Sequence, residues 1–175
     1  MHKDKKINIC QISLARDIPI ILENYRFFKK FYTSFEITII CPNKEILEFK
    51  KKLNFKEFII INEENIISFE EFSNIFEELS NGVEYQYLFR KRLNWYYQQI
   101  LKLSHVLSFV KQKKENIIIW DADTIILNKI NFFKGELSVK YGTLFEFHKA
   151  YHITNKSIIG DCPKYFISSL VQFIG

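Results

Sequence analysis

Short apolar runs of strand length alternate along this chain with longer segments whose apolar residues recur every three or four positions. The expected strands cover residues 7–14, 37–40, 58–61, 117–120, 125–127, 137–141 and 144–147. Such alternation is typical of an α/β domain in which helices flank a parallel sheet. The run 117–120 is entirely apolar, as expected of a central strand buried on both faces. The sequence therefore predicts a Rossmann-like, mostly parallel sheet.

Capping signals and apolar spacing place the first two helices. Asp17 is expected to cap a helix that has Pro19 in its first turn. One face of this helix is expected to carry Ile21, Tyr25, Phe28 and Tyr32. The second helix is expected to contain Ile46, Leu47, Phe49 and Leu53.

Two more helices are expected before the 117–120 strand. Ser68 and Glu71 form a capping box for a short helix that runs through Phe76 and closes at residues 81–82, Asn-Gly. The longest helix covers about residues 90–111 and is expected to pack on the sheet. Its apolar positions are Leu93, Tyr97, Ile100, Leu103, Leu107 and Val110.

Composition bounds the class of protein. The chain has 175 residues, of which 47% are hydrophobic and 26% charged, with five Gly and three Pro. These values exclude disordered, collagen-like and low-complexity chains and allow one domain, over residues 1–175, with a core of its own.

The charge balance is mildly basic, with 25 Lys and Arg against 20 Asp and Glu. The lysines form short clusters at 29–30, 50–52 and 111–114 without interleaved aromatic residues. This pattern favours a solvated surface over a nucleic-acid groove, so no nucleic-acid partner is predicted.

Cysteine usage and the N-terminus bear on the compartment. Cys10, Cys41 and Cys162 are an odd number with no paired spacing, which indicates buried free thiols in a reducing compartment. Neither a signal peptide nor a membrane-spanning run is found. A cytoplasmic protein is predicted, with peripheral contact at the inner membrane face left open.

Two acidic residues follow the most apolar strand, in the segment IIIWDADTIIL. In an extended backbone Asp121 and Asp123 would face the same side across Ala122, at the strand edge where open α/β sheets bind ligands. Two neighbouring carboxylates repel each other and therefore favour a hard divalent cation such as Mg²⁺ or Mn²⁺. These ions also bind phosphate oxygens, so the natural ligand is a metal–diphosphate.

Two alternative interpretations of this segment stay open. One is a solvated turn with two surface aspartates. The other is a phosphatase of the haloacid-dehalogenase type, in which Asp121 is the nucleophile. An EF-hand is excluded, because Ile125 stands at the fifth position and no Gly follows.

Three other groups of polar residues are candidates. Trp95, Gln98, Gln99 and Lys102 share one flank of the long helix, where a solvent-facing polar edge is the plainer interpretation. Arg16 and Asp17 would contact a nucleotide base or, for Asp17, cap the helix. Glu146, His148 and His152 are interpreted as surface residues, because the zinc-protease motif requires Glu where Lys149 stands.

The segment NWYYQQILKLS (94–104), followed by WDADTIIL (120–127) and then by two Phe, resembles a family of bacterial glycosyltransferases of the GT-A fold. Those proteins carry Gly-Trp-Tyr-x-Gln-Gln before a Trp-Asp-Ser/Ala-Asp-Thr strand end, and Asn94 replaces the Gly here. Residues 151–160 are similar to their following helix. The resemblance is weak from residue 7 and clearest from 90 to about 160.

This resemblance implies transfer of a sugar from a nucleotide-sugar donor to a glycan or lipid-linked glycan acceptor, as in lipooligosaccharide or capsule assembly. By the family's motif, Asp123 would bind the Mn²⁺ or Mg²⁺ that bridges the donor diphosphate. Asp121 would contact the donor's ribose or sugar, or the metal through water. Arg16 and Asp17 would lie near the base. The donor or acceptor pocket would include Trp95, Gln98, Gln99 and Lys102.

Members of this family continue past the position where this chain stops. Acceptor contacts, a late metal-binding residue and any catalytic base come from that C-terminal half. The resemblance therefore predicts a donor-binding domain that lacks part of the acceptor half, with a non-catalytic remnant as the alternative to an active enzyme.

Overall fold

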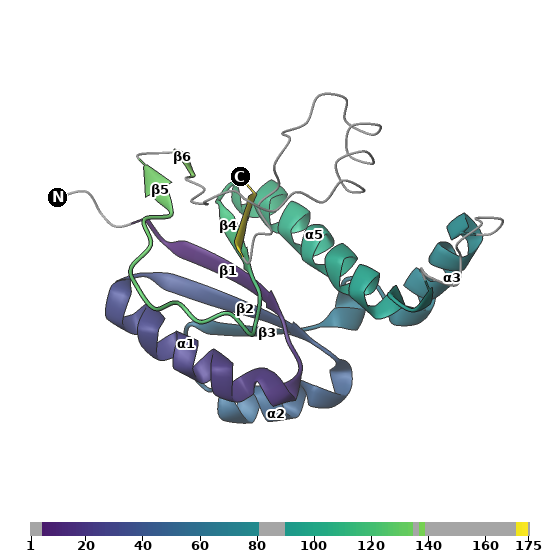
Figure 1. Cartoon of the computed structure of the whole chain (residues 1–175), viewed down its shortest axis with the longest axis horizontal. Helices are drawn as coiled ribbons and strands as arrows, with labels where there is room; N and C mark the ends of the chain where they lie inside the picture. Colours follow the sequence, from purple (N-terminus) through teal and green to yellow (C-terminus); the bar gives the residue numbers. More distant parts are fainter. Residues whose placement is uncertain (1–4, 81–89, 135–136, 139–170, 175) are drawn as a thin grey trace.

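The computed structural model describes residues 5–80, 90–134, 137–138 and 171–174. Within these ranges the main sheet has the strand order β3-β2-β1-β4-β7 (Figure 1). The strands are β1 (Ile7–Ile12), β2 (Phe35–Cys41), β3 (Phe58–Asn62), β4 (Ile117–Trp120) and β7 (Val171–Ile174). Strands β1 to β4 run parallel, and β7 pairs antiparallel with β4. The predicted α/β class, with a mostly parallel sheet flanked by helices, is confirmed.

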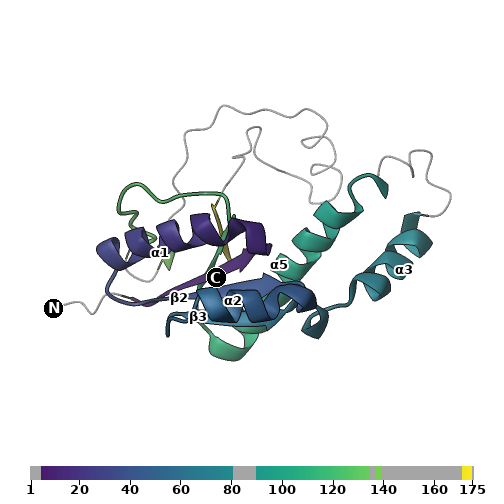
Figure 2. The ribbon, with the colours of Figure 1, turned by 90° about the horizontal axis from the view of Figure 1, so that it is seen from below.

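Helices cover both faces of this sheet. Helices α1 (Ile18–Phe31) and α2 (Ile46–Lys52) lie side by side on one face (Figures 1 and 2). Helix α5 (Leu93–Lys113) packs on the other face, against β1 and β4. Helix α3 (Phe69–Ser80) packs on α5 rather than on the sheet, and it lies with the N-terminal part of α5 beyond the sheet edge (Figures 1 and 2).

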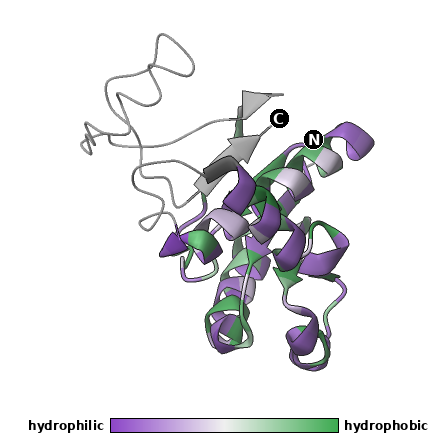
Figure 3. Cartoon of the chain, turned by 90° about the vertical axis from the view of Figure 1, so that its right-hand side faces the viewer, coloured by the Kyte–Doolittle hydropathy of each residue, from purple (hydrophilic) through white to green (hydrophobic). Residues whose placement is uncertain are grey.

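Strand β4 supplies both cores because its side chains alternate between the two faces. Ile118 and Trp120 join the cluster under α1 and α2, whereas Ile117 and Ile119 join Val106 of α5. All four residues of β4 are buried, as predicted. Figure 3 shows hydrophobic and hydrophilic residues alternating along the helices, as elements between a core and solvent require.

Helix α1 begins at the position that the sequence predicts for it. Asp17 occupies the N-cap position, Pro19 lies in the first turn, and Ile21, Tyr25 and Phe28 are buried. Phe28 packs edge-on against Trp120, with ring centroids 5.6 Å apart. Burial of a side chain of this size contributes about 1.5–3 kcal/mol to stability.

The predicted packing face of α5 is right in part: Tyr97 is buried and Leu93 and Val110 pack against core clusters, whereas Ile100 is exposed. Its buried residues are Tyr97, Leu101 and Val106, while Leu103 and Leu107 are exposed, the latter by 62%. The steps of three and four identify a helix, but they do not determine which of its sides meets the sheet. The helix itself, with bounds two residues later than expected at its C-terminal end, is confirmed.

Strand boundaries differ at β1 because the chain turns earlier than its apolar run suggests. Ser13 still donates from its backbone to Ile40, at 3.1 Å, but the Leu14 nitrogen donates to the Asp17 carboxylate instead of to a strand. No strand forms at residues 125–127, because Ile126 donates to a side chain of α1 and its neighbours Ile125 and Leu127 are exposed.

Three short strands complete the described fold. β5 (Phe133–Lys134) and β7 were not expected, and β6 (Leu137–Ser138) covers the start of the expected 137–141 strand. Several expectations fall outside the described residues: the 144–147 strand, the 81–82 turn, the 151–160 helix, Glu146, His148, His152 and Cys162. Cys10 and Cys41 are buried free thiols, as predicted.

Candidate functional site

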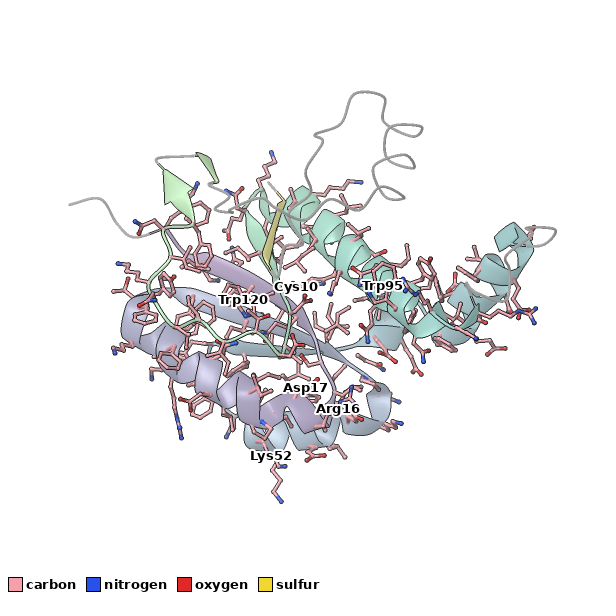
Figure 4. All side chains as sticks on the ribbon, viewed as in Figure 1. Cys10, Arg16, Asp17, Lys52, Trp95 and Trp120 are labelled. Atoms are coloured by element: carbon pink, nitrogen blue, oxygen red, sulfur yellow. The ribbon has the colours of Figure 1, made fainter. Side chains whose placement is uncertain are left out.

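A pocket of about 1090 Å³ opens at the carboxyl ends of the parallel strands, between these strand ends and α5. The eight residues predicted to bind the donor or the metal all line it: Arg16, Asp17, Trp95, Gln98, Gln99, Lys102, Asp121 and Asp123. Figure 4 labels Arg16 and Asp17 near the end of β1 and Trp95 on α5. Residues more than a hundred positions apart in the sequence are thus gathered around one cavity.

The two aspartates lie on a turn and not on an extended strand. The strand ends at Trp120, and the Thr124 nitrogen donates a 3.0 Å hydrogen bond to the Asp121 carbonyl oxygen. The same-side argument from strand geometry therefore does not apply, although both residues line the pocket. Ala122 between them is buried, which anchors the turn.

Buried Asn24 of α1 holds the chain that leaves this turn. Its amide nitrogen donates to the Thr124 carbonyl, and its Oδ1 accepts a 2.8 Å hydrogen bond from the Ile126 nitrogen. The indole nitrogen of Trp120 donates to the same Thr124 carbonyl at 2.8 Å. Sequence reasoning missed Asn24. The available signal was an amide within the apolar face of α1, between Ile21 and Phe28.

Asp121 and Asp123 differ in their electrostatic surroundings. Lys102 Nζ lies 2.7 Å from Asp121 Oδ1, and the two side chains are 12% and 38% exposed. Asp123 is exposed, and within the described ranges neither a hydrogen bond nor an ion pair engages its carboxylate. One carboxylate is thus neutralised by a protein cation, while the other is open to a ligand.

The loop between β1 and α1 is closed by protein carboxylates. Asp17 Oδ2 accepts a 2.9 Å hydrogen bond from the Leu14 nitrogen, and Glu45 Oε2 accepts a 2.7 Å bond from the Ala15 nitrogen. The carboxylate of Asp17 thus bonds upstream of the helix and makes no capping bond to α1. The backbone amides of Leu14 and Ala15, which could otherwise donate to a phosphate, are thus occupied by protein carboxylates.

Arg16 and Asp17 are close but weakly paired. Arg16 Nε lies 3.7 Å from Asp17 Oδ1, and the Arg16 side chain is 81% exposed. A pair this exposed adds little stability, so the guanidinium is available at the mouth of the pocket.

Aromatic side chains form the wall opposite the β1–α1 loop. Trp95, on the first turn of α5, is 50% exposed, and Phe69 of α3 lines the same wall. Tyr97 packs edge-on against Phe69 at 5.1 Å and donates from its hydroxyl to the Ile67 carbonyl at 2.8 Å. The polar flank of α5 therefore faces the pocket and is not a plain solvent edge.

Acidic residues outnumber basic ones in the lining. Glu63 and Glu64, on the turn after β3, join the three aspartates, against Arg16, Lys44 and Lys102. Burial raises the pKa of Glu63, and the charges of Glu64 and Glu45 raise it further. Sequence reasoning missed Glu63 because nothing in its segment marks it as facing a pocket.

A buried hydroxyl of the lining and a buried thiol outside it also bear on chemistry. The hydroxyl of Ser13, at the end of β1, is buried without a hydrogen-bond partner among the described atoms. Burial raises the pKa of the neighbouring Cys10 thiol to about 12, against the opposing effect of Lys102. A thiol whose pKa is raised in this way is mainly protonated at neutral pH.

In the described residues, the candidate metal ligands are the two carboxylates of the turn after β4. No three His, Cys, Asp or Glu side chains of these residues gather into a set that could hold an ion by themselves. Magnesium is commonly held by one or two carboxylates together with substrate phosphates, and Asp123 with Asp121 fits that pattern. None of the helices in the described ranges combines the length and apolarity of a membrane span.

The sequence was also compared with known proteins. No model of a protein family matches this chain, and no curated protein matches it.

Proposed function

We propose that this protein is a metal-dependent glycosyltransferase that takes a sugar from a nucleotide-diphosphate sugar. The observation that carries the proposal is the gathering of Asp121 and Asp123 with Lys102 on one pocket at the carboxyl edge of a parallel sheet. That edge is where open α/β sheets bind nucleotides. The cavity volume, about 1090 Å³, lies just above the usual range for ligand sites, about 300–1,000 Å³, and suits a ligand of nucleotide-sugar size.

Charge supports the need for a cation. A nucleoside diphosphate brings negative charge into a pocket whose lining already has more acidic than basic side chains. Asp123 would hold Mn²⁺ or Mg²⁺, because its carboxylate is exposed and unengaged within the described residues. When bound, the ion would supply charge neutralisation of the leaving diphosphate.

The remaining lining residues suit the other parts of such a donor. Arg16 and Asp17, at the end of β1, would lie near the base. Trp95 offers a half-exposed aromatic face for a flat or apolar ring surface, and Gln98 and Gln99 offer amides for hydroxyl groups. These assignments follow from the family resemblance, and they are supported by the position of all these residues in the lining of one pocket.

The acceptor in this proposal is a bacterial surface glycan or its lipid-linked precursor, reached in the cytoplasm at the inner membrane face. Exposed lysines at the ends of α2 and α5 would contact anionic lipid: Lys50, Lys51, Lys111, Lys113 and Lys114. Co-sedimentation with anionic but not zwitterionic vesicles, reversed by salt, would test this part separately.

A thermal-melt screen tests the donor site. The chain is melted with UDP, GDP, CDP or CMP, each with and without Mn²⁺. With Mn²⁺, a nucleoside diphosphate at about one hundred times its dissociation constant should raise the melting temperature by roughly 5–10 °C, and without metal by clearly less. Asp123→Asn should abolish the part of the rise that Mn²⁺ adds, while Glu48→Gln, an exposed acid outside the pocket, should keep it.

Two further assays separate the alternatives. Release of nucleoside diphosphate from a nucleotide sugar distinguishes an enzyme from a binding remnant. The phosphatase interpretation replaces this proposal if two results are obtained together. No nucleotide raises the melting temperature, and the wild type hydrolyses small phosphate esters with Mg²⁺ whereas the Asp121→Asn variant does not.

A further inference from the structure

Lys102 is held against Asp121 by its position in the fold. It lies on the turn of α5 that follows Tyr97, packed toward β1 and β4, with only 12% of its side chain exposed. Its ammonium is close enough to the Cys10 thiol to oppose the rise in that thiol's pKa. The charge therefore sits between the sheet and the pocket and not on an outer surface.

This position splits the Asp-x-Asp pair into two unlike sites. Asp121 already has a cation 2.7 Å from Oδ1. Asp123, two residues on, has none among the described residues. A divalent ion that approached both carboxylates would meet the positive charge of Lys102.

We propose that Lys102 is a resident cation of the pocket that competes with a divalent ion for Asp121 and binds diphosphate oxygens when a ligand is present. The inference rests on the proposed function, because it needs a diphosphate in this pocket. An ammonium has three donors and a flexible four-carbon stem, so it can exchange one anionic partner for another. Among the basic residues of the described lining, Lys102 is the most buried, with 12% of its side chain exposed against 81% for Arg16.

A purely structural ion pair would behave differently. If the pair only stabilises the packing of α5 near the end of β4, then Lys102→Met and Asp121→Asn should both lower the free energy of unfolding. Neither variant should then change the ligand affinities of the folded protein. Competition predicts instead that the two variants shift ligand affinities in opposite directions. Lys102→Met is expected to fold, since Met is unbranched and of similar length, and the half-exposed Asp121 stays hydrated.

The experiment measures two dissociation constants on the full chain, after thermal melts establish which variants fold. Free Mn²⁺ is followed by electron paramagnetic resonance without nucleotide, and inorganic pyrophosphate is titrated by calorimetry in EDTA. Lys102→Met should bind Mn²⁺ about tenfold tighter and pyrophosphate about tenfold more weakly. Asp121→Asn should do the reverse, because it frees the ammonium. Lys102→Arg keeps the charge and should stay near wild type for pyrophosphate.

The control is Lys52→Met, which removes a Lys–carboxylate pair of the same 2.7 Å length on the surface of α2, outside the pocket (Figure 4). It should change neither constant. Wild-type binding of both probes with unchanged constants in Lys102→Met and Asp121→Asn would overturn this inference alone. Absence of any Mn²⁺ and pyrophosphate binding to the wild type would overturn the proposed function and this inference together.

Discussion

Asn24 Oδ1 accepts a hydrogen bond from the backbone nitrogen of Ile126, 2.8 Å away, although 102 residues separate the two in sequence. The other end of the same amide donates to the Thr124 carbonyl. One buried side chain of α1 therefore fixes the path of the chain just after the two aspartates. The shape of the turn depends on this distant helix as much as on its own sequence.

Replacing Asn24 by Ala should destabilise the protein by about 1–3 kcal/mol, because a buried amide and a carbonyl would lose a partner. The free energy of unfolding is measured by urea titration. The matched control, Asn74→Ala on the exposed side of α3, should change it by less than about 0.5 kcal/mol. Equal stability of the two variants would show that the turn does not need Asn24.

The two helices on the α1 side offer a second matched pair. Phe28 is fully buried against Trp120, whereas Leu47 of α2 is 81% exposed. Phe28→Ala should cost about 3–5 kcal/mol through lost burial and a cavity, and Leu47→Ala less than about 0.5 kcal/mol. Chemical denaturation of both variants checks the values. A large loss for Leu47→Ala would mean that this side chain is covered in solution.

Glu63 is predicted to weaken the fold at neutral pH. Burial, then Glu64 and Glu45, raise its pKa in the folded state above the unfolded value, so the folded chain favours the protonated acid. The cost is absent below the unfolded pKa, appears as pH rises and is complete above the folded pKa.

Glu63→Gln should therefore raise the free energy of unfolding at pH 7, and the gain should shrink toward pH 4. Urea titrations of variant and wild type at both pH values give this difference. Glu70→Gln serves as the control, since that exposed acid in the first turn of α3 is favoured by the helix dipole and its loss should give no gain. A gain for Glu63→Gln that is the same at pH 4 and pH 7 would contradict the assignment.

The two tryptophans report on different places. Trp95 is half exposed in the pocket lining, while Trp120 is buried in the core. A nucleotide with Mn²⁺ should change the emission of the wild type, and Trp95→Phe should remove most of that change while keeping the blue-shifted emission of Trp120. An undiminished response in Trp95→Phe would place the ligand away from this wall.

The sheet was predictable because its signals are local. The apolar run 117–120 is followed at once by acids, and Asp17 with Pro19 marks a helix start without any knowledge of the partners. Which face of α5 is buried was not predictable, since Leu103 and Leu107 share the same spacing as true core residues. Periodicity states that a helix has an apolar side but not which element lies on it.

For the site, too, the residues could be predicted from the sequence but their mutual contacts could not. The eight residues chosen from motif and resemblance all reached one pocket, yet their mutual contacts were hidden. The Lys102–Asp121 pair joins a helix to the end of a strand, and Asn24 meets its partners across about a hundred residues. Contacts of this kind depend on the order of the strands in the sheet, and a single sequence does not determine that order.

The placement of β4 also has a consequence for the order in which the chain folds. The pairing of β1 with β2 joins Ile7 to Phe35, whereas β4 pairs with Asn8 through Ile117. Closing the longer loop costs more entropy and slows pairing, so we expect β1, β2 and β3 to pair before β4 joins them. The turn that carries both aspartates would then acquire its shape late in folding. A destabilised chain could keep a protected β1–β2 hydrogen-bond ladder while its pocket is still unformed.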